Sequence, residues 1–398
     1  MDITIYPGKL RGKISAIPSK SQAHRYLICA AFADKPTDIV CPQTNQDIEA
    51  TADCLNALGA SIHRTENGYY VLPVANIPKV ATLDCRESGS TLRFLLPIVG
   101  ALGVDATFTL SGRLPQRPLS PLWEELERMG CRLSRPSKNT IFSTGRLLPG
   151  EYRIAGNISS QYITGLLFAL SLIPGKSSLQ IVGTLESAPY VDMTLQALTA
   201  FGVNANYESI SGQFPFRSPG KVHVEGDWSN AAFFLAAKAL GNEVTVEGLC
   251  EDSLQGDRAV AYVLNQLLVN RTINAQDIPD LVPILAVVAG AKQGATFTGV
   301  SRLRLKESDR VATVAAMLQN FGLGISATDN TLSVAPGRFR SCTVDSYLDH
   351  RIAMSAAIAA TVADGPVTIK GAECVSKSYP SFWEEYRKLG GNYEQYIR

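Results

Sequence analysis

The 398-residue sequence has only four histidines, and no two of them have the spacing of metal ligands. Its eight cysteines occur singly, without a Cys-x-x-Cys pair. We therefore expect no built-in metal site, and small buried thiols in a reducing compartment are the economical interpretation. The formal net charge is only +1, which argues against a broad surface for nucleic acid or another polyanion.

Long hydrophobic runs are also missing. The apolar stretches are interrupted too early to span a bilayer, and residues 1–7 lack the basic and then apolar pattern of a signal peptide. These absences predict a soluble, cytoplasmic protein without a membrane partner. The length of the chain predicts two or three domains with a sizeable core.

Two types of predicted helix alternate along the chain. One type is amphipathic and ends in an apolar residue followed by glycine, as at Leu58-Gly59 and Phe321-Gly322. This ending recurs roughly every 70 residues with one gap, which residues 257–268 fill without the glycine. The other type is apolar on all sides, as buried helices are. Its members are residues 19–33, 88–102, 159–173, 228–240, 279–290 and 349–362.

The alternation of these helices with short β-rich segments predicts six α/β units. Residues 213–220 carry two prolines and a glycine without helical periodicity, and they separate three units from three. A predicted strand at residues 3–10 precedes the first buried helix, with Gly12 as a possible hinge. The sequence thus predicts an α/β fold of two lobes, residues 1–12 plus 221–398 and residues 13–220, with a cleft between them.

A run of charges at residues 302–310 is the most conspicuous local feature. Residues 302–306 alternate basic and apolar side chains, so a strand here would place three cations on one face. A helical period begins at Glu307, and Glu307, Ser308 or Asp309 could cap that helix. Such a junction can bind an anion and move a proton. The alternative is a solvated charge run held by salt bridges.

Other predicted helix starts carry similar groups. Lys20, Ser21 and Arg25 surround the first turn of a buried helix and could form an anion cradle, although an ordinary serine cap is the alternative. Gly89 would let a ligand approach the backbone, and Arg93 follows one turn later. Basic residues lie at or beside eight positions of this kind: Lys20, Arg25, Arg93, Arg117, Lys306, Arg310, Arg351 and Lys377.

Two carboxylates complete this constellation. Asp280 opens an otherwise apolar helix, where it is either a cap or a base in a dry cleft. If the helix starts of both lobes face one cleft, Asp280 and Glu307 form an acid–base pair in a positive field. Two separate anionic substrates are then plausible.

Taken together, these motifs resemble the 5-enolpyruvylshikimate-3-phosphate (EPSP) synthase family of enolpyruvyl transferases over essentially the whole chain. The resemblance implies two lobes of three βαβαββ units each, an inside-out α/β barrel-like fold. It also implies transfer of the enolpyruvyl group of phosphoenolpyruvate to the 5-hydroxyl of shikimate 3-phosphate, in the pathway to chorismate. The matching motifs are Lys20-Ser21, Ser88-Gly89-Ser90, Arg117-Pro118, Ser159-Ser160-Gln161, Ile278-Pro279-Asp280, residues 306–310, Asp349-His350-Arg351 and Lys377.

The resemblance also implies roles for individual residues. Glu307 would protonate the methylene of phosphoenolpyruvate, Asp280 would accept the hydroxyl proton, and Lys20 would stabilise developing charge. Phosphoenolpyruvate would bind Lys20, Gly89, Arg93, Arg117, Gln161, Arg310, Arg351 and Lys377. Shikimate 3-phosphate would bind Lys20, Ser21, Arg25, Ser159, Ser160, Gln161, Ser187, Asp280 and Lys306, with Tyr190 as a further candidate. No metal or organic cofactor is implied, and we expect a monomer that is sensitive to glyphosate at the phosphoenolpyruvate site.

Two positions depart from the family pattern. Arg302 stands where asparagine is frequent, and its role is unexplained, while Gly89-Ser90-Thr91 has threonine where one branch of the family has alanine, a difference that bears on inhibitor sensitivity and not on substrate choice. Three other functions remain open. A UDP-N-acetylglucosamine enolpyruvyl transferase usually has a cysteine in its active-site loop, but residues 111–118 have none. An RNA 3′-phosphate cyclase needs a nucleophilic histidine, for which His350 is the only candidate within a motif. A non-catalytic scaffold could bind an anionic metabolite without converting it.

Overall fold

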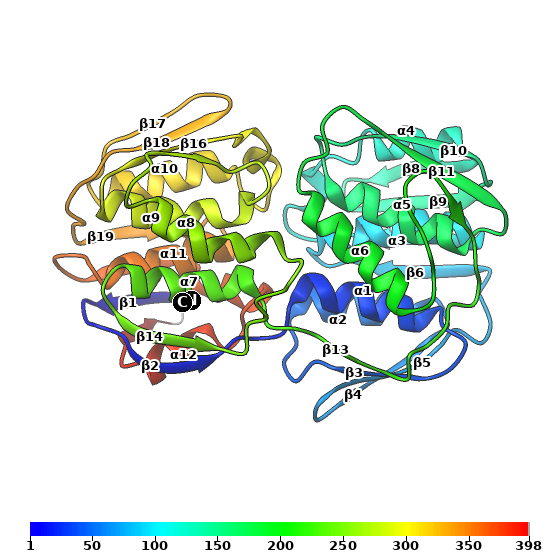
Figure 1. Cartoon of the computed structure of the whole chain (residues 1–398), viewed down its shortest axis with the longest axis horizontal. Helices are drawn as coiled ribbons and strands as arrows, with labels where there is room; N and C mark the ends of the chain where they lie inside the picture. Colours follow the sequence, from blue (N-terminus) through cyan, green and yellow to red (C-terminus); the bar gives the residue numbers. More distant parts are fainter. Residues whose placement is uncertain (397–398) are drawn as a thin grey trace. The chain divides into compact units, whose positions relative to one another are not determined.

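The computed structural model describes residues 1–396 and divides the chain into two compact units (Figure 1). Unit 1 comprises Met1–Ile17 and Gly226–Arg398, and unit 2 comprises Pro18–Glu225. The chain therefore passes between units after Ile17 and after Glu225. Gly12 does not lie at a crossing, because it is part of strand β2 (Arg11–Ser15), which pairs in parallel with β14 (Glu243–Glu247).

Unit 1 contains three sheets, with strand orders β19-β20-β1-β21, β15-β16-β18-β17 and β14-β2. Its core surrounds helices α7, α9 and α11, which contact one another and consist largely of buried residues. The helices are α7 (Trp228–Ala239), α8 (Val260–Gln266), α9 (Val282–Ala291), α10 (Arg310–Asn320), α11 (His350–Ala360) and α12 (Phe382–Lys388), with 3₁₀ helices η2 (Gly256–Ala259), η3 (Pro279–Leu281), η4 (Ser301–Leu305) and η5 (Ala372–Lys377). The remaining strands are β1 (Asp2–Tyr6), β15 (Thr272–Asn274), β16 (Ala295–Thr298), β17 (Ile325–Ala327), β18 (Thr331–Val334), β19 (Cys342–Asp345), β20 (Val367–Lys370) and β21 (Asn392–Tyr396).

Unit 2 also contains three sheets, with strand orders β13-β3-β5-β4, β6-β7-β9-β8 and β10-β11-β12. Its buried helices are α1, α3 and α5. The helices are α1 (Lys20–Ala31), α2 (Gln46–Ala57), α3 (Gly89–Leu102), η1 (Leu114–Gln116), α4 (Leu122–Arg128), α5 (Ser160–Leu172) and α6 (Ala188–Ala200). The strands are β3 (Thr37–Val40), β4 (Ser61–Thr65), β5 (Gly68–Leu72), β6 (Val80–Asp84), β7 (Asp105–Thr109), β8 (Cys131–Ser137), β9 (Thr140–Gly145), β10 (Glu151–Ala155), β11 (Lys176–Val182), β12 (Ile210–Ser211) and β13 (Lys221–His223).

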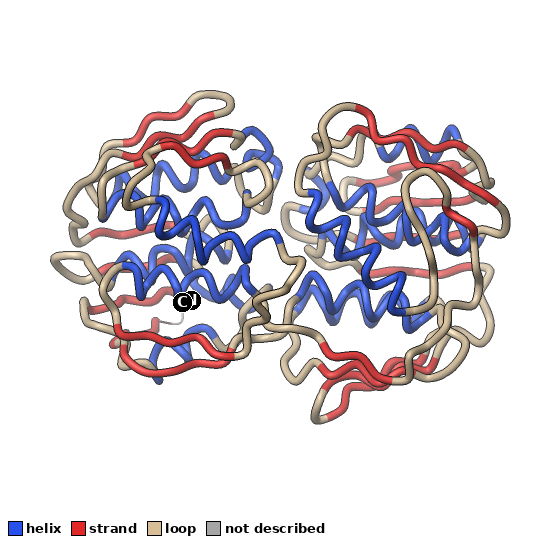
Figure 2. The backbone as a smooth tube through the Cα atoms, in the orientation of Figure 1, coloured by secondary structure: helices blue, strands red, loops and turns tan. Residues whose placement is uncertain are grey.

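The same local arrangement recurs in both units, and it makes the fold mixed α/β. Two parallel strands are joined through a buried helix, as β6 and β7 are through α3 and β15 and β16 are through α9. Parallel pairing requires such a crossover, and a helix buried against the sheet must be apolar on most sides. Antiparallel hairpins such as β8–β9 and β17–β18 follow the amphipathic helices. Figure 2 shows the helices gathered inside each unit and the strands toward its outside.

The structure confirms the six predicted buried helices and all six amphipathic ones, to within a few residues at their ends. The predicted strand at residues 302–306 is wrong, because residues 301–305 form the 3₁₀ helix η4. A five-residue alternation of basic and apolar side chains was too short to specify a strand. Leu303 is fully buried whereas Leu305 is 41% exposed, so the two leucines do not share a buried face.

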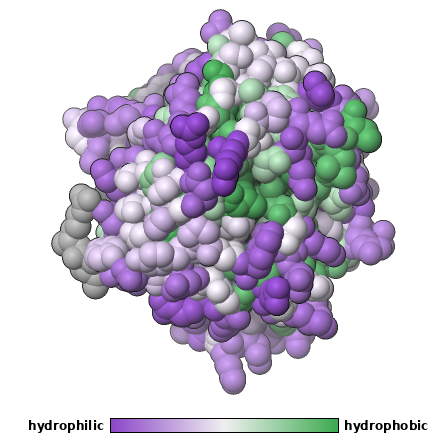
Figure 3. Space-filling model, turned by 90° about the vertical axis from the view of Figure 1, so that its left-hand side faces the viewer, coloured by the Kyte–Doolittle hydropathy of each residue, from purple (hydrophilic) through white to green (hydrophobic). Residues whose placement is uncertain are grey.

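The surface agrees with the composition. Hydrophilic side chains cover much of the face seen in Figure 3, with smaller hydrophobic areas between them. Within residues 1–396, no helix combines the length and hydrophobicity that crossing a membrane requires. Six of the eight cysteines are buried, Cys342 is half-buried and Cys250 is exposed, and none is in a disulfide.

Helices α3 and α5 pack closely because a glycine faces the partner backbone. A Cβ atom on Gly165 would lie 2.2 Å from the carbonyl oxygen of Arg93 and 3.1 Å from Cγ of Pro97. This contact lies in the early part of both helices, so it also sets the separation of their N-terminal turns.

We predict that Gly165→Ala lowers the free energy of unfolding by about 1–3 kcal/mol, because a backbone atom cannot move aside as a flexible side chain can. Urea denaturation at equilibrium measures the effect. Gly8→Ala is the matched control, since the nearest atom to an added Cβ there is 4.0 Å away. Equal stability of the two variants would contradict the prediction.

Candidate active site

The first cluster of chemistry-bearing residues lies in unit 1 and centres on Arg310. Asp309 caps α10 by accepting hydrogen bonds from the backbone N–H groups of Val311 and Ala312. The cap leaves Arg310 as the first helical residue, with a side chain only 1% exposed. A guanidinium ion buried this deeply needs partners of opposite charge.

Three carboxylates provide these partners. Arg310 donates from Nη1 to Asp280 Oδ1 at 2.6 Å, from Nη2 to Glu307 Oε2 at 2.6 Å, and from Nε to Asp349 Oδ2 at 2.8 Å. The structure thus brings the predicted acid–base pair, Asp280 and Glu307, onto two nitrogens of one guanidinium group. Burial by itself lowers the pKa of Arg310, but the three carboxylates outweigh it and raise that pKa, so the side chain stays charged.

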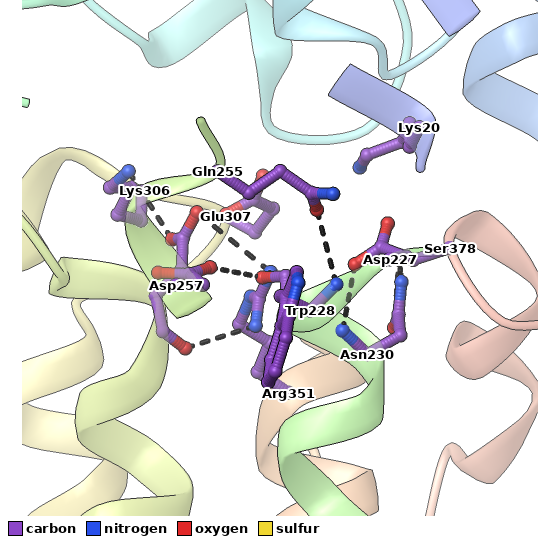
Figure 4. Close-up of polar contacts among 12 residues, drawn as sticks. Lys20, Asp227, Trp228, Asn230, Gln255, Asp257, Lys306, Glu307, Arg351 and Ser378 are labelled. Atoms are coloured by element: carbon purple, nitrogen blue, oxygen red, sulfur yellow. Dashed lines mark hydrogen bonds and ion pairs between the residues drawn. The ribbon is translucent and has the colours of Figure 1, made fainter. Parts of the chain in front are cut away.

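Lys306 and Arg351, two more of the basic residues singled out in the sequence, lie close to Asp280. Lys306 Nζ is 3.3 Å from Asp280 Oδ1, and Arg351 Nη2 is 3.8 Å from Asp280 Oδ2. Arg351 also donates from Nη1 to the Asp280 carbonyl at 2.9 Å. Figure 4 shows Lys306, Glu307 and Arg351 gathered near the beginning of α7.

The charges of this cluster shift one another's pKa values. Burial raises the pKa of Asp280, but Lys306, Arg351 and Arg310 together bring it well below the ordinary value of 3.8. Burial lowers the pKa of Lys306, and the Arg310 charge lowers it further, although Asp280 opposes both effects. In this state Asp280 is an ionised but weak base.

Asp349 is the third carboxylate that pairs with Arg310. It is fully buried, caps α11 through the N–H of Arg351 at 3.0 Å, and accepts a hydrogen bond from Ser308 Oγ at 2.9 Å. Burial raises its pKa, but the Arg310 guanidinium outweighs burial, so the net pKa of Asp349 is lowered. Asp349 therefore acts as the ionised counter-charge of Arg310 within the core.

The sequence reasoning missed two members of the cluster, Ser229 and Asp257. Arg351 Nη2 donates to Ser229 Oγ at 2.6 Å, and the Ser229 hydroxyl donates to the buried Asp257 carboxylate. Burial, followed by repulsion from Asp280, raises the pKa of Asp257 to about 6. Only their positions could have pointed to these two residues, because both lie at the starts of helices that the hydrophobic periodicity predicts.

Two further basic residues of unit 1, Lys377 and Arg302, donate hydrogen bonds to backbone carbonyls. Lys377 Nζ donates to the Leu348 carbonyl at 3.0 Å. Arg302 is 9% exposed and donates from Nη2 to the Gln276 carbonyl at 2.7 Å. Arg302 thus ties η4 to the loop that leads into Asp280.

The second cluster lies in unit 2, at the starts of α3 and α5. Arg93 Nη1 donates to Gln161 Oε1 at 3.0 Å, and Gln161 Nε2 donates to Ser90 Oγ at 2.9 Å. A Cβ on Gly89 would lie 2.5 Å from Arg93 Nη1 and 2.7 Å from Arg117 Nη1. The structure therefore places the guanidinium groups of Arg93 and Arg117 against Gly89. Gly89 is the first residue of α3, and the N-terminus of a helix is suited to binding an anion.

Lys20 and Arg25 of α1 are used differently. Lys20 Nζ forms an ion pair with Asp47 Oδ2 at 2.8 Å. Arg25 is 3% exposed and donates to Thr194 Oγ1 at 2.9 Å and to the carbonyls of Ser21 and Tyr190 at 2.6 Å each. Burial lowers the pKa of Arg25 to about 10. These contacts show Arg25 connecting α1 to α6.

The predicted serines lie at helix starts. Ser159 caps α5 by accepting from the N–H of Gln161, and Ser160 is its first residue. Ser187 precedes α6 with a φ of +56°, a conformation that is uncommon for residues other than glycine. Such backbone strain is frequent in ligand sites.

The arrangement suits proton transfer beside a bound anion. In unit 1, two carboxylates with exposed fractions of 21% and 27% share a buried arginine next to Lys306 and Arg351. In unit 2, two arginines and an amide surround a helix start. Across residues 1–396, no group of three or more His, Cys, Asp or Glu side chains is placed to hold a metal ion.

We predict that the raised pKa of Asp257 makes stability depend on pH. A folded-state pKa of about 6, above the ordinary 3.8, contributes stability that is present at low pH and lost as pH rises through 6. Asp280 and Asp349 act oppositely, but only below pH 4, since their pKa values are lowered. Relative to the wild type, Asp257→Asn should gain about 2 kcal/mol between pH 4.5 and 7.5 in urea unfolding.

The exposed Asp252→Asn is the control for this experiment. A constant difference between Asp257→Asn and the wild type across this range would contradict a raised pKa of Asp257.

Comparisons with known proteins identify the family of the chain. A family model described as EPSP synthase (3-phosphoshikimate 1-carboxyvinyltransferase) matches residues 5–386. The 3-phosphoshikimate 1-carboxyvinyltransferase of Clostridium kluyveri is 37% identical over 420 residues, covering 99% of this chain and 98% of that protein. The protein of the same name from Clostridium perfringens is 38% identical over 418 residues, covering 98% of each chain.

A solved structure leads to the same family. The EPSP synthase of Acinetobacter baumannii superposes with a TM-score of 0.80 at 25% sequence identity, covering 99% of each chain. Because the family model spans nearly all of the sequence and full-length relatives share more than a third of it, the chain belongs to the EPSP synthase family.

Proposed function

We propose that this chain transfers the enolpyruvyl group of phosphoenolpyruvate to the 5-hydroxyl of shikimate 3-phosphate and releases inorganic phosphate. Family membership supports the overall reaction. The observation that carries the mechanism is the pair of carboxylates, Asp280 and Glu307, held on one buried guanidinium group. The reaction needs one group to give a proton and another to take one, and this pair supplies both.

The anionic groups of the substrates require many donors, and both clusters provide them. Arginine binds phosphate and carboxylate through two parallel hydrogen bonds, and helix N-termini add backbone N–H groups. We assign phosphoenolpyruvate to Lys20, Gly89, Arg93, Arg117, Gln161, Arg310, Arg351 and Lys377. We assign shikimate 3-phosphate to Lys20, Ser21, Arg25, Ser159, Ser160, Gln161, Ser187, Asp280 and Lys306. Within this set, the contacts of Arg25 support a role in positioning α1 and α6.

The charge balance at Asp280 suggests how binding prepares the reaction. The cations that lower its pKa are Lys306, Arg351 and Arg310. Two of these, Arg310 and Arg351, are the ones assigned to phosphoenolpyruvate. Once a trianion shares their charge, less of it remains to stabilise the ionised form of Asp280, so its pKa rises toward the range in which a carboxylate is an effective base.

The steps then follow from proton positions. Glu307 gives its proton to the methylene carbon of phosphoenolpyruvate, which makes the neighbouring carbon electrophilic. The 5-hydroxyl oxygen attacks that carbon while Asp280 accepts the hydroxyl proton, and Lys20 stabilises the charge that develops. In the resulting tetrahedral intermediate, the Glu307 carboxylate takes a proton back from the methyl group as the carbon–oxygen bond to phosphate breaks, and Asp280 gives the hydroxyl proton to the departing phosphate. The products are an enol ether and inorganic phosphate.

The finer architecture and setting are part of the same proposal. Each unit has three sheets, which supports a fold of two lobes with three βαβαββ units each. The free thiols support a reducing compartment such as the cytoplasm. We further propose that the chain acts as a monomer.

Phosphate release tests the function and the two carboxylates together. Pure protein should release phosphate from phosphoenolpyruvate only when shikimate 3-phosphate is present, and UDP-N-acetylglucosamine should not replace it. We predict that Asp280→Asn and Glu307→Gln each lower kcat by roughly two to four orders of magnitude, because each removes a proton-transfer group. Calorimetry should show that binding of shikimate 3-phosphate changes far less than kcat.

The control is Asp329→Asn, an exposed carboxylate in the hairpin between β17 and β18, which should leave kcat unchanged. Absence of phosphate release by the folded wild type would refute the function. Parallel losses of binding and turnover would instead assign the two carboxylates a structural role.

We also propose that Arg302 is a positioning residue for Asp280. Its hydrogen bond to the Gln276 carbonyl holds the loop that enters η3, where Asp280 is the second residue. Its charge also contributes, as the smallest of the effects that lower it, to the lowered pKa of Lys306. Arg302 is therefore connected to the ion pair of Asp280 and Lys306 both through a hydrogen bond and through its charge.

We predict that Arg302→Met lowers kcat about tenfold, because a misplaced catalytic group slows reaction steeply. The basic limb of the pH profile of kcat/KM should also move to higher pH, since Lys306 keeps its proton longer without a neighbouring cation. Arg302→Lys should restore the position of that limb but not the whole of kcat. A loss of thermal stability with an unchanged pH profile would show that Arg302 is only structural.

A further inference from the structure

A cavity of about 550 Å³ lies in unit 1, apart from the Arg310 cluster. Its walls come from α7, from the end of β14 with the loop that follows, and from α8. Their apolar lining consists mainly of Trp228, Leu235, Ala239, Val246, Leu249 and Leu264. The volume and the mainly apolar walls are those of a site for a small molecule.

The topology explains why this place is open. The sheet beside α7 has only the strands β14 and β2, whereas the other two sheets of unit 1 have four strands each. After α10 the chain forms the β17–β18 hairpin, but after α8 it continues directly into β15 of the neighbouring sheet. Fewer elements therefore surround α7 and α8, and apolar side chains such as Leu235, Val246 and Leu249 remain half-buried.

Two opposite charges line the same cavity. Lys238 comes from α7, and Glu251 comes from the loop after β14. Both are exposed, and within residues 1–396 neither side chain has a recorded ion pair or hydrogen bond. The Glu251 loop is itself anchored, because Arg258 donates from Nη1 to the Glu251 carbonyl. This contact holds the backbone of the loop that carries the Glu251 side chain.

We propose that this cavity binds a small zwitterion with an apolar side chain, which is the chemistry of a free apolar amino acid. The ligand's carboxylate pairs with the Lys238 ammonium and its ammonium pairs with the Glu251 carboxylate. Its side chain removes apolar surface of Leu235, Val246 and Leu249 from water. A purely apolar molecule would leave both charges unused, and a singly charged one would use only one of them.

The indole of Trp228 connects the cavity to a measurable signal. Trp228 is 7% exposed, lines the cavity and donates from Nε1 to the Cys250 carbonyl at 3.0 Å. Ser229, the next residue, accepts the hydrogen bond from Arg351. Occupancy therefore changes the surroundings of an indole one residue away from the Arg310 cluster. The binding proposal itself does not depend on the proposed function.

The test uses the full chain without substrates and four probes. L-Phenylalanine and L-leucine carry both charges, 3-phenylpropanoate carries only the carboxylate, and 2-phenylethylamine carries only the ammonium. Calorimetry should give saturable binding of both amino acids, with a Kd for phenylalanine at least about tenfold below those of its two singly charged analogues. Phenylalanine should also change the tryptophan fluorescence of the wild type, and this change should be absent in Trp228→Phe.

Surface variants separate the site from adventitious binding. Lys238→Gln and Glu251→Gln should each raise the Kd of phenylalanine about tenfold or more, whereas Lys370→Gln, another exposed lysine of unit 1, should not. Ala261→Phe should remove binding by filling the cavity, and circular dichroism would show that each variant is folded. No saturable binding to the folded wild type, equal binding of 3-phenylpropanoate, or an unchanged Kd in both charge variants would overturn the proposal.

Discussion

The structure of unit 1 depends on one buried cation. Arg310 is 1% exposed, and a guanidinium group in that position is tolerated only with charged partners and well-formed hydrogen bonds. Its partners Asp280, Glu307 and Asp349 come from η3, from the turn before α10 and from the cap of α11. These segments are therefore held in register by electrostatics as well as by packing. Removal of any one carboxylate would take a charged hydrogen-bond acceptor from the buried guanidinium group.

The same arrangement links stability to reactivity. The cations that hold Asp280 in place also depress its pKa, so the resting cluster is stable but poorly basic. An anionic substrate that shares those cations would reverse this balance only while it is bound. Asp257 lies at the other end of the network, through Ser229 and Arg351, with a pKa raised by burial. One connected set of side chains thus contains carboxylates whose pKa values are shifted in opposite directions.

In unit 2, the hydrogen-bond donors lie at the starts of helices. Gly165 allows α5 to approach the backbone of α3, and Gly89 allows Arg93 and Arg117 to approach the beginning of α3. Arg25 illustrates the contrast with Arg310. Arg25 donates its hydrogen bonds to neutral oxygens, and burial lowers the pKa of Arg25. The carboxylates around Arg310 instead raise the pKa of Arg310. Buried arginines in the two units therefore connect helices by different means.

The sequence by itself determined the helices, because hydrophobic periodicity, capping residues and terminal glycines act locally. It also indicated the family, because several short motifs occur in one order along the whole chain. It could not predict the 3₁₀ helix at residues 301–305, since five residues of alternation are compatible with more than one structure. Only the tertiary structure joined Ser229 and Asp257 to Arg351, left Lys377 beside Leu348, and opened the cavity between α7 and α8. Those contacts depend on which segments distant in sequence meet, and no local pattern encodes that.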